Sequence, residues 1–440
     1  MAITWAVARR WRLSRQYLLD GAADATEVVG RLTTIPAWAG DPELAVALRL
    51  AKPSPSAVEM ALADGRLIRT YSFRGSTHFM RPQDAGMILA LRAAGRQWER
   101  KSWQDHYGLS AADWPHLRRT VREALAAGPL TQTELADAVT ADSRYAHLGP
   151  ALTAASHTFL KPFAWQGDLA LGPSRGGKVT FLALEGHPGW SSPSDLDESG
   201  RRAILGYLGA YGPATADRLH YWFGEGLSAG HQRIERWIRE ISEWTTYLNV
   251  DGDRALCLAE HADDIASTPA AGSVILLPGY DQWVLGPGTG DTRVVAAQLR
   301  PLVTRGANLV LVDGVVGGIW TIKKHRLHIG LPSENAVDCS LLVPAVERLA
   351  SFVSQADLDV VINTCSWRTC SSSECDARCA RGGRGSPTCS RAPRYCDVVR
   401  KPVAQRSLFS TAQSSGLESA RLDHARSGRN AVIGQCALLA

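Results

Sequence analysis

Two neighbouring side chains near the N-terminus, Trp38 and Asp41, have chemistries that suit a reacting or binding site. The carboxylate of Asp41 could orient a water molecule for hydrolysis, as a general base does. It could instead cap the helix that Pro42 begins, and we favour the cap, because Asp at the N-cap and Pro at the first helical position are both common. The Trp38 ring could stack on a nucleobase or lie in the core, and both interpretations stay open.

A second group of polar side chains lies at a glycine turn in residues 74–78. It contains Arg74, Ser76, Thr77 and His78. Arg74 could bind a phosphate, and His78 could face DNA, contact a flipped base or take part in catalysis. The alternative is a turn arginine in solvent and a histidine satisfied between two strands. The two interpretations carry equal weight here.

A third candidate is the basic loop around Gly176 and Gly177, which carries Arg175 and Lys178. Such a loop can present charge and backbone N–H groups to phosphates. It lacks the strand–loop–helix order and the Lys-Ser/Thr ending of an ATP-binding loop. We therefore expect no nucleotide there, and favour a solvated hairpin loop slightly over a DNA contact.

A fourth candidate is the polar face of the predicted helix 229–241. Opposite a stripe that includes Ile234 and Trp237, this face carries His231, Gln232, Arg233, Glu235, Arg236, Arg239 and Glu240. Gln232, Arg233 and Arg236 could contact phosphates or base edges from a recognition helix. Because acidic residues are interspersed, an ordinary solvated face is the favoured interpretation.

The elements that would position these residues follow a repeated plan. Helix, helix–turn–helix and hairpin occur in that order over residues 1–110, 111–190 and 191–268. The predicted hairpins span 67–80, 163–171 and 245–259, the last around Asp251-Gly252, a strong turn signal. This order is typical of winged-helix units, in which one helix can enter the major groove and the hairpin touches the backbone. We therefore predict an α+β fold with three tandem units.

The remainder of the chain has a different character. Residues 269–364 are β-rich, with predicted strands at 273–277, 282–285, 308–312 and 315–322, and a final helix at 344–354. From residue 365 onward Ser, Arg, Gly, Pro and Cys dominate and periodicity is lost, so no structure is assigned to 365–440. Arg outnumbers Lys 41 to 7 in the whole chain, which suggests a GC-rich genome and an out-of-frame origin for this tail.

Charge and cysteine are concentrated in the same tail. The net charge is +5, but residues 365–440 hold twelve basic and five acidic residues, a charge of +7, which leaves −2 for the rest. Net charge therefore gives little support to nucleic-acid binding.

Seven of the nine cysteines lie in residues 365–440 too, without the structured segments that zinc modules have between ligand pairs, so no metal is expected. No apolar run approaches the ~18 to 20 residues of a membrane span, and we expect a cytoplasmic protein.

Three stretches, 61–78, 276–286 and 309–320, resemble a family of bacterial winged-helix DNA-binding proteins whose characterised members are alkylpurine DNA glycosylases. The resemblance covers residues 10–360 and implies three winged-helix units, a β-rich C-terminal part and a DNA channel. It places Arg305 at a position that faces this channel. In the glycosylases a Gln-x-Gln or Gln-x-Asp motif positions water against the glycosidic bond. The matching positions here are Ala37, Trp38 and Ala39, and an alanine methyl group cannot orient water.

The resulting expectation is a monomeric, nucleoid-associated protein that binds double-stranded DNA and lacks the catalytic glutamines of the family. It needs no cofactor and does not contact a membrane. One alternative is a divergent monofunctional glycosylase that excises alkylated purines with Asp41 or His78. Another is a degraded paralogue without activity.

Overall fold

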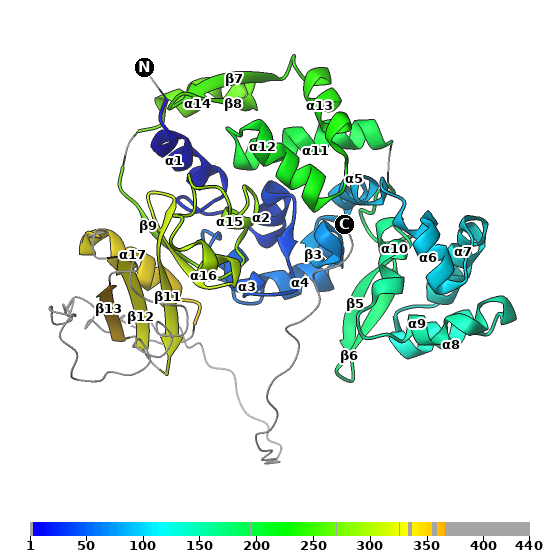
Figure 1. Cartoon of the computed structure of the whole chain (residues 1–440). Coiled ribbons are helices and arrows are strands. Elements are labelled where there is room, and N and C mark those ends of the chain that lie inside the picture. The colour runs from blue at the N-terminus through cyan, green and yellow to red at the C-terminus, as the bar shows by residue number, and fades with distance from the viewer. Residues whose placement is uncertain are drawn as a thin grey trace, which may run out of the picture. The chain divides into compact units, whose positions relative to one another are not determined.

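Helices and sheets are mixed in the computed structural model of the protein (Figure 1), which describes residues 3–193, 195–269, 271–324, 326–332, 337–353 and 359–365. All of them belong to one unit, Met1–Lys401, and the second unit, Pro402–Ala440, lies outside the described residues. The tail predicted to lack structure falls outside them too, apart from Cys365. Within the described residues no helix combines the length and apolar character that crossing a membrane requires.

The N-terminal region is helical with one hairpin. Its elements are α1 (Trp5–Arg15), α2 (Ala25–Leu32), β1 (Ile35–Pro36), α3 (Pro42–Ala47), α4 (Ala57–Ala63), β2 (Ile68–Tyr71), β3 (Thr77–Met80), α5 (Pro82–Ala93) and α6 (Lys101–Tyr107). Strands β2 and β3 pair antiparallel from Ile68↔Met80 to Tyr71↔Thr77, which confirms the predicted hairpin. The strand β1 pairs antiparallel with β3, on the side away from β2, and Pro36 lies opposite His78.

The second region contains a hairpin at a different place from the prediction. Its elements are α7 (Trp114–Leu125), β4 (Leu130–Thr131), α8 (Gln132–Thr140), α9 (Gly149–Leu152), α10 (Lys161–Trp165), β5 (Leu169–Arg175) and β6 (Lys178–Ala183). The hairpin predicted over 163–171 is wrong: Pro162 favours a helix start, and Gly167, with φ +80°, follows the helix end. The true turn is Gly176-Gly177, where both φ angles are positive.

The third region follows the prediction closely. It comprises α11 (Leu196–Tyr211), α12 (Ala216–Leu219), the π-helical segment η6 (His220–Gly226), α13 (His231–Glu240), β7 (Thr245–Val250), β8 (Asp253–Leu258) and α14 (Ala262–Ser267). Asp251 and Gly252 both have positive φ, as a tight hairpin turn requires. The predicted stripe of α13 is buried, and Trp237 packs so closely on α11 that a Cβ at Gly200 would lie 2.3 Å from its ring.

The C-terminal region forms a five-stranded sheet in the order β13-β12-β11-β10-β9. Its elements are β9 (Val274–Leu277), α15 (Gln282–Leu285), α16 (Arg300–Thr304), β10 (Asn308–Val312), β11 (Val315–Lys323), β12 (Arg326–Pro332), α17 (Cys339–Ala350) and β13 (Asp359–Cys365). The helix α17 packs on β9. The strand predicted at 282–285 is wrong, because Asp281 caps a helix there by accepting a hydrogen bond from Trp283 N at 2.7 Å.

The hydrophobic cores cross the boundaries between these regions. Strands β1 to β6 form one sheet in the order β1-β3-β2-β5-β6-β4, so the first two regions share it. One core cluster joins Val28 and Leu32 of α2 with Tyr207 of α11 and Trp237 of α13. Another joins Leu13 of α1 and residues of α3 to the C-terminal sheet. The three sequence repeats therefore do not correspond to three separate cores.

A buried ion pair links the N-terminal region to the C-terminal one. The two terminal nitrogens of Arg49 donate to the two carboxylate oxygens of Asp281 at 2.8 and 2.7 Å, and Arg49 also donates to Ala45 O at 2.8 Å. Both side chains are fully buried, and the residues are 232 apart in sequence. A bidentate arginine–carboxylate pair fixes both position and orientation. This pair therefore sets where the loop before α15 meets α3.

We expect Arg49→Met to lower the free energy of unfolding by ~3 to 5 kcal/mol, because it leaves the Asp281 carboxylate buried without its partner. The double variant with Asp281→Asn should recover much of this loss, since Asn is neutral and still caps α15. Urea unfolding followed by tryptophan fluorescence measures both.

The matched control is Arg201→Met, which breaks exposed pairs with Glu198 and Glu240. It should cost less than ~1 kcal/mol, as surface ion pairs do. An Arg49→Met variant no less stable than this control would contradict the role given to the buried pair.

Candidate nucleic-acid interface

A pocket lies where α3 and the loop before α15 meet. Its cavity volume is only about 10 Å³, which is roughly the room that one water molecule needs. It is lined by Leu32, Ile35, Pro36, Ala39, Asp41, Pro42, Ala45, Arg49, Gly279, Tyr280, Asp281 and Gln282. Its backbone segments touch: a Cβ at Gly40, where φ is +76°, would lie 2.2 Å from Gly279 O. A Cβ at Gly279 would in turn lie 2.0 Å from Gly306 O. Only glycine permits these approaches, so the pocket wall is built from backbone.

The segment Ala37-Trp38-Ala39 lies beside this pocket, and its last residue, Ala39, lines it. Ala37 and Ala39 are half-buried, and Ala37 N donates to Thr77 O at 2.9 Å, which attaches the segment to the β2–β3 hairpin. Trp38 is 48% exposed, and its ring centroid lies 4.9 Å from that of Tyr280 at an angle of 49°. The structure thus offers an accessible aromatic pair at this position. Of the two interpretations of Trp38, it favours the exposed surface over the core.

Asp41 has the capping role that the sequence favoured. Its Oδ1 accepts a hydrogen bond from Leu44 N at 2.9 Å at the start of α3. The side chain is exposed and lines the pocket, so the cap does not remove it from solvent. It remains the nearest carboxylate to the Ala37–Ala39 segment along the chain.

His78 does not reach the surface. It is 5% exposed, its Nδ1 lies 3.0 Å from Ser76 O, and its ring packs 5.5 Å from that of Phe73. Burial lowers the pKa of His78 to about 4, with the nearby Arg74 charge acting in the same direction against a raising backbone hydrogen bond. A neutral, buried imidazole between strands cannot meet DNA in this conformation. Ser76 and Thr77 beside it are half-buried.

Gln282 is a pocket residue that the sequence did not single out. It is 3% exposed, and its Nε2 donates to Thr34 O at 2.5 Å. Within the described part of the chain its Oε1 is buried without a hydrogen-bond partner. An unsatisfied buried acceptor is costly and therefore notable. The capping signal at Asp281 could have placed this side chain on a helix, but its meeting with Thr34 depends on the tertiary fold.

The side chain of Arg74 packs against η6. It has φ +50° in the turn of the hairpin, and its guanidinium carbon lies 4.8 Å from the ring centroid of Tyr221. Its NH2 is 3.9 Å from a Glu225 carboxylate oxygen, and the side chain is half-exposed. Beneath it the rings of Phe73 and Trp222 are 4.4 Å apart. The first hairpin is thus fixed to the third region.

The polar face of α13 is mixed in charge, as expected. Gln232 and Arg233 are exposed, and Arg233 donates to Ala229 O at 3.2 Å. Arg236 forms ion pairs with Asp197 and Glu240. Of the three candidates, Gln232 and Arg233 remain available to a partner without breaking an ion pair between described residues.

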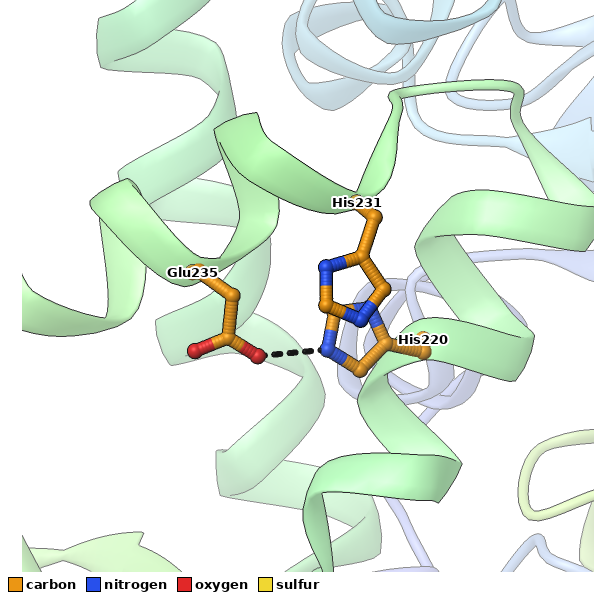
Figure 2. Close-up of side chains that lie close together, drawn as sticks. All are labelled: His220, His231 and Glu235. Atoms are coloured by element: carbon orange, nitrogen blue, oxygen red, sulfur yellow. Dashed lines mark hydrogen bonds and ion pairs between the residues drawn. The ribbon is translucent and has the colours of Figure 1, made fainter.

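A cluster that the sequence analysis missed lies at the start of the same helix. His220 Nε2 is 2.6 Å from Glu235 Oε1, and the His220 ring stacks on that of His231 with centroids 3.8 Å apart (Figure 2). The spacing of His231 and Glu235, one helical turn apart, was the available signal. Nothing in the local sequence indicated that His220 joins them.

The remaining basic candidates are separate from one another. Arg175 forms an ion pair with Glu134 and hydrogen-bonds Pro129 O at 3.4 Å, and Lys178 is exposed opposite it across the hairpin turn. These contacts stay within the second region. Arg305 is exposed and directly precedes Gly306, whose backbone touches the pocket loop. The structure therefore brings Arg305 near the pocket but leaves Arg175 and Lys178 in their own hairpin.

Comparison with known proteins gives concordant results. The profile of the family "DNA glycosylase AlkZ-like" matches residues 21–352. An interstrand DNA cross-link repair glycosylase from Streptomyces sahachiroi is 35% identical over 366 residues, which cover 81% of this chain and 97% of the relative. The solved structure of the Streptomyces sahachiroi DNA glycosylase AlkZ superposes with a TM-score of 0.77 at 32% identity, over 82% of this chain and all of that one. With most of its length matched in sequence and in fold, this chain belongs to the AlkZ-like DNA glycosylase family.

Proposed function

We propose that this protein recognises damaged or distorted duplex DNA, with three winged-helix units around a channel, and does not use the glutamine-based excision chemistry of its relatives. The observation that carries this proposal is the segment Ala37-Trp38-Ala39, which reaches the pocket through Ala39 and in which an exposed tryptophan is flanked by two methyl groups. Methyl groups neither accept nor donate hydrogen bonds, so these two positions cannot hold an attacking water. A DNA partner places the protein with the nucleoid, and we propose that it acts as a monomer.

The aromatic pair supports binding without chemistry. Trp38 and Tyr280 present ring faces beside a pocket, and base–aromatic stacking contributes ~1 to 3 kcal/mol per base. Bases that are already unpaired or damaged cost least to take out of the stack. A protein with this pair would therefore prefer distorted sites over regular duplex.

Phosphate contacts would come from local patches, because the chain outside its tail is slightly acidic. Arg305 lies near the pocket, while Arg74, Gln232 and Arg233 lie at the surface formed by the first hairpin, η6 and α13. Each neutralised phosphate contributes a salt-dependence slope of about −0.9 on a log–log plot. With only a few such residues, the affinity for DNA should fall as salt is added. The slope of this fall should be smaller than for strongly basic repressors.

A second candidate function is base excision by a different water-positioning group. The specific observation is that the Asp41 carboxylate and Gln282 line the same pocket, and that the buried Gln282 Oε1 has no hydrogen-bond partner in the part of the chain that the structure describes. Asp41 would act as the general base and Gln282 would hold the water. His78, the other catalytic candidate of the sequence, does not support this function because it is buried.

One prediction of this proposal concerns restored base excision. In a full-length protein, Ala37→Gln with Ala39→Gln should release N3- or N7-alkylpurines from duplex DNA, because amide groups return to the pocket edge. Base release is measured by chromatography. The size-matched control, Ala37→Met with Ala39→Met, should stay inactive, and equal activity in both would contradict the proposal.

The wild-type protein discriminates between the two functions in the same assay. We expect it to release no base. Release by wild type that is lost in Asp41→Asn would support the enzyme instead, since Asn keeps the helix cap but is not a base. If the wild-type protein neither releases a base nor binds DNA at low salt, both functions are excluded.

A further prediction concerns the recognition of distorted DNA. Trp38→Ala should weaken binding to a duplex with an unpaired or abasic position by about 5- to 150-fold, from the stacking energy of one base. Fluorescence anisotropy at fixed salt measures the affinity. The control is Trp244→Ala, which removes another half-exposed tryptophan. Equal affinities for Trp38→Ala and this control would contradict a stacking role.

A further inference from the structure

We propose that His220, His231 and Glu235 bind a zinc ion that fastens the start of α13 to η6. This inference is independent of DNA binding and of base excision. It rests on the arrangement of the three side chains, which come from two segments separated by the turn 227–230. Their candidate ligand atoms all lie within 4.8 Å of one another.

The three residues come from two different elements. His231 and Glu235 project from the same face of α13, one turn apart, and His220 comes from the first position of η6. Figure 2 shows a nitrogen of each ring on the side where the Glu235 carboxylate lies. The two rings are stacked and nearly parallel, at 7°, so one of them must turn before both can bind one ion, because a metal lies in the plane of each imidazole that binds it. Two imidazoles and one carboxylate thus share a small volume.

This donor set suits zinc. Imidazole nitrogen and carboxylate oxygen are zinc ligands, and two histidines with one glutamate are a known three-ligand set that leaves a fourth position for water. Zinc bonds of ~2.0 to 2.1 Å in tetrahedral geometry require ligand atoms about 3.4 Å apart. The Nε2 of His220 and the carboxylate oxygen of Glu235 are already closer, at 2.6 Å, and the metal would take the place of the hydrogen between them.

The side chains that must move to complete the metal geometry are the more exposed ones. The His231 side chain is exposed and that of Glu235 is 41% exposed, whereas that of His220 is only 19% exposed. Exposed side chains change rotamer freely, so His231 and Glu235 can turn toward a metal held on the more fixed His220.

The surroundings leave open space beside the cluster. The hollow there is lined by Asp217, Arg218, His220, Tyr221, Gly224, Glu225 and His231. Its charges are balanced, because the Asp217 and Glu225 carboxylates lie near two guanidinium groups, that of Arg218 and that of Arg74, which is 3.9 Å from Glu225. The hollow leaves room for a water on the fourth coordination position.

The location gives the metal a structural consequence. The turn between η6 and α13 contains Ser228 and Gly230, both with positive φ, and η6 itself is π-helical. Such segments are less regular than an α-helix and often occur at functional places. A metal bridging His220 and His231 would close a short loop across this turn and hold the exposed end of α13, with Gln232 and Arg233, in one orientation.

The test uses zinc alone and the full-length chain. Free thiolates are zinc ligands and seven cysteines lie in the tail, so accessible thiols are first capped with iodoacetamide to exclude their contribution. Isothermal titration of the capped wild type should then show one equivalent bound with a micromolar or tighter dissociation constant. Cobalt substitution should give visible absorption typical of nitrogen and oxygen ligands, without thiolate charge-transfer bands.

His220→Ala and His231→Ala should each weaken this binding at least ~100-fold, because even residues that only support a ligand contribute ~10- to 100-fold. His147→Ala, which removes an exposed histidine elsewhere, is the matched control and should bind as wild type does. Absence of stoichiometric binding by the capped wild type, or equal binding by these variants, would overturn the proposal.

The Glu235→Gln variant separates a loss of zinc binding from a loss of folding. Gln keeps a hydrogen-bonding partner for His220 but is a poor zinc ligand, so in EDTA its melting temperature should match that of wild type. Zinc at about 100 times the dissociation constant should raise the wild-type melting temperature by ~2 to 5 °C and leave this variant unchanged. An equal zinc-induced shift in both proteins would contradict the site.

Discussion

The buried ion pair between Arg49 and Asp281 is the interaction on which the candidate site depends. It joins residues 232 positions apart without access to solvent, and both partners line the pocket. Asp281 also caps α15, and this places Gln282 against Thr34. Because a bidentate pair fixes distance and orientation together, the pocket geometry follows from this one contact.

The same interdependence extends through the molecule. The cores join the N-terminal helices to the third region and to the C-terminal sheet, and the first two hairpins share one sheet. As a result Arg74, which lies far from η6 in sequence, contacts Tyr221. Side chains of the first hairpin and of η6 are therefore brought together by packing between regions, so changes in the core will alter the surface that they form.

The family and the pocket carry different information about chemistry. Membership in the AlkZ-like DNA glycosylases rests on most of the chain, while the chemistry depends on a few atoms at one edge of one pocket. Here Ala39 lines the pocket next to the exposed indole of Trp38. The Asp41 carboxylate and Gln282 line the same pocket, and the Gln282 Oε1 has no hydrogen-bond partner among the described residues. A fold can keep its DNA-binding geometry while its reacting groups change, because the two depend on different residues.

The sequence alone determined features governed by neighbours along the chain. The hairpin at Asp251-Gly252 follows from turn residues that tolerate positive φ, and the cap of α3 follows from Asp41 and Pro42. Sequence periodicity also found the buried stripe of α13. Such features require only local geometry, which explains why one chain segment specifies them.

The tertiary structure decided the features that need distant residues or burial. Short apolar runs suit either a strand or a helix, so the predictions at 163–171 and 282–285 were wrong where Pro162 and Asp281 start helices. The burial of His78 and the meeting of His220 with His231 and Glu235 leave no local signal, because they arise when separate segments pack. Local preferences fix backbone angles, whereas the positions of side chains from distant segments are fixed only by the closed core.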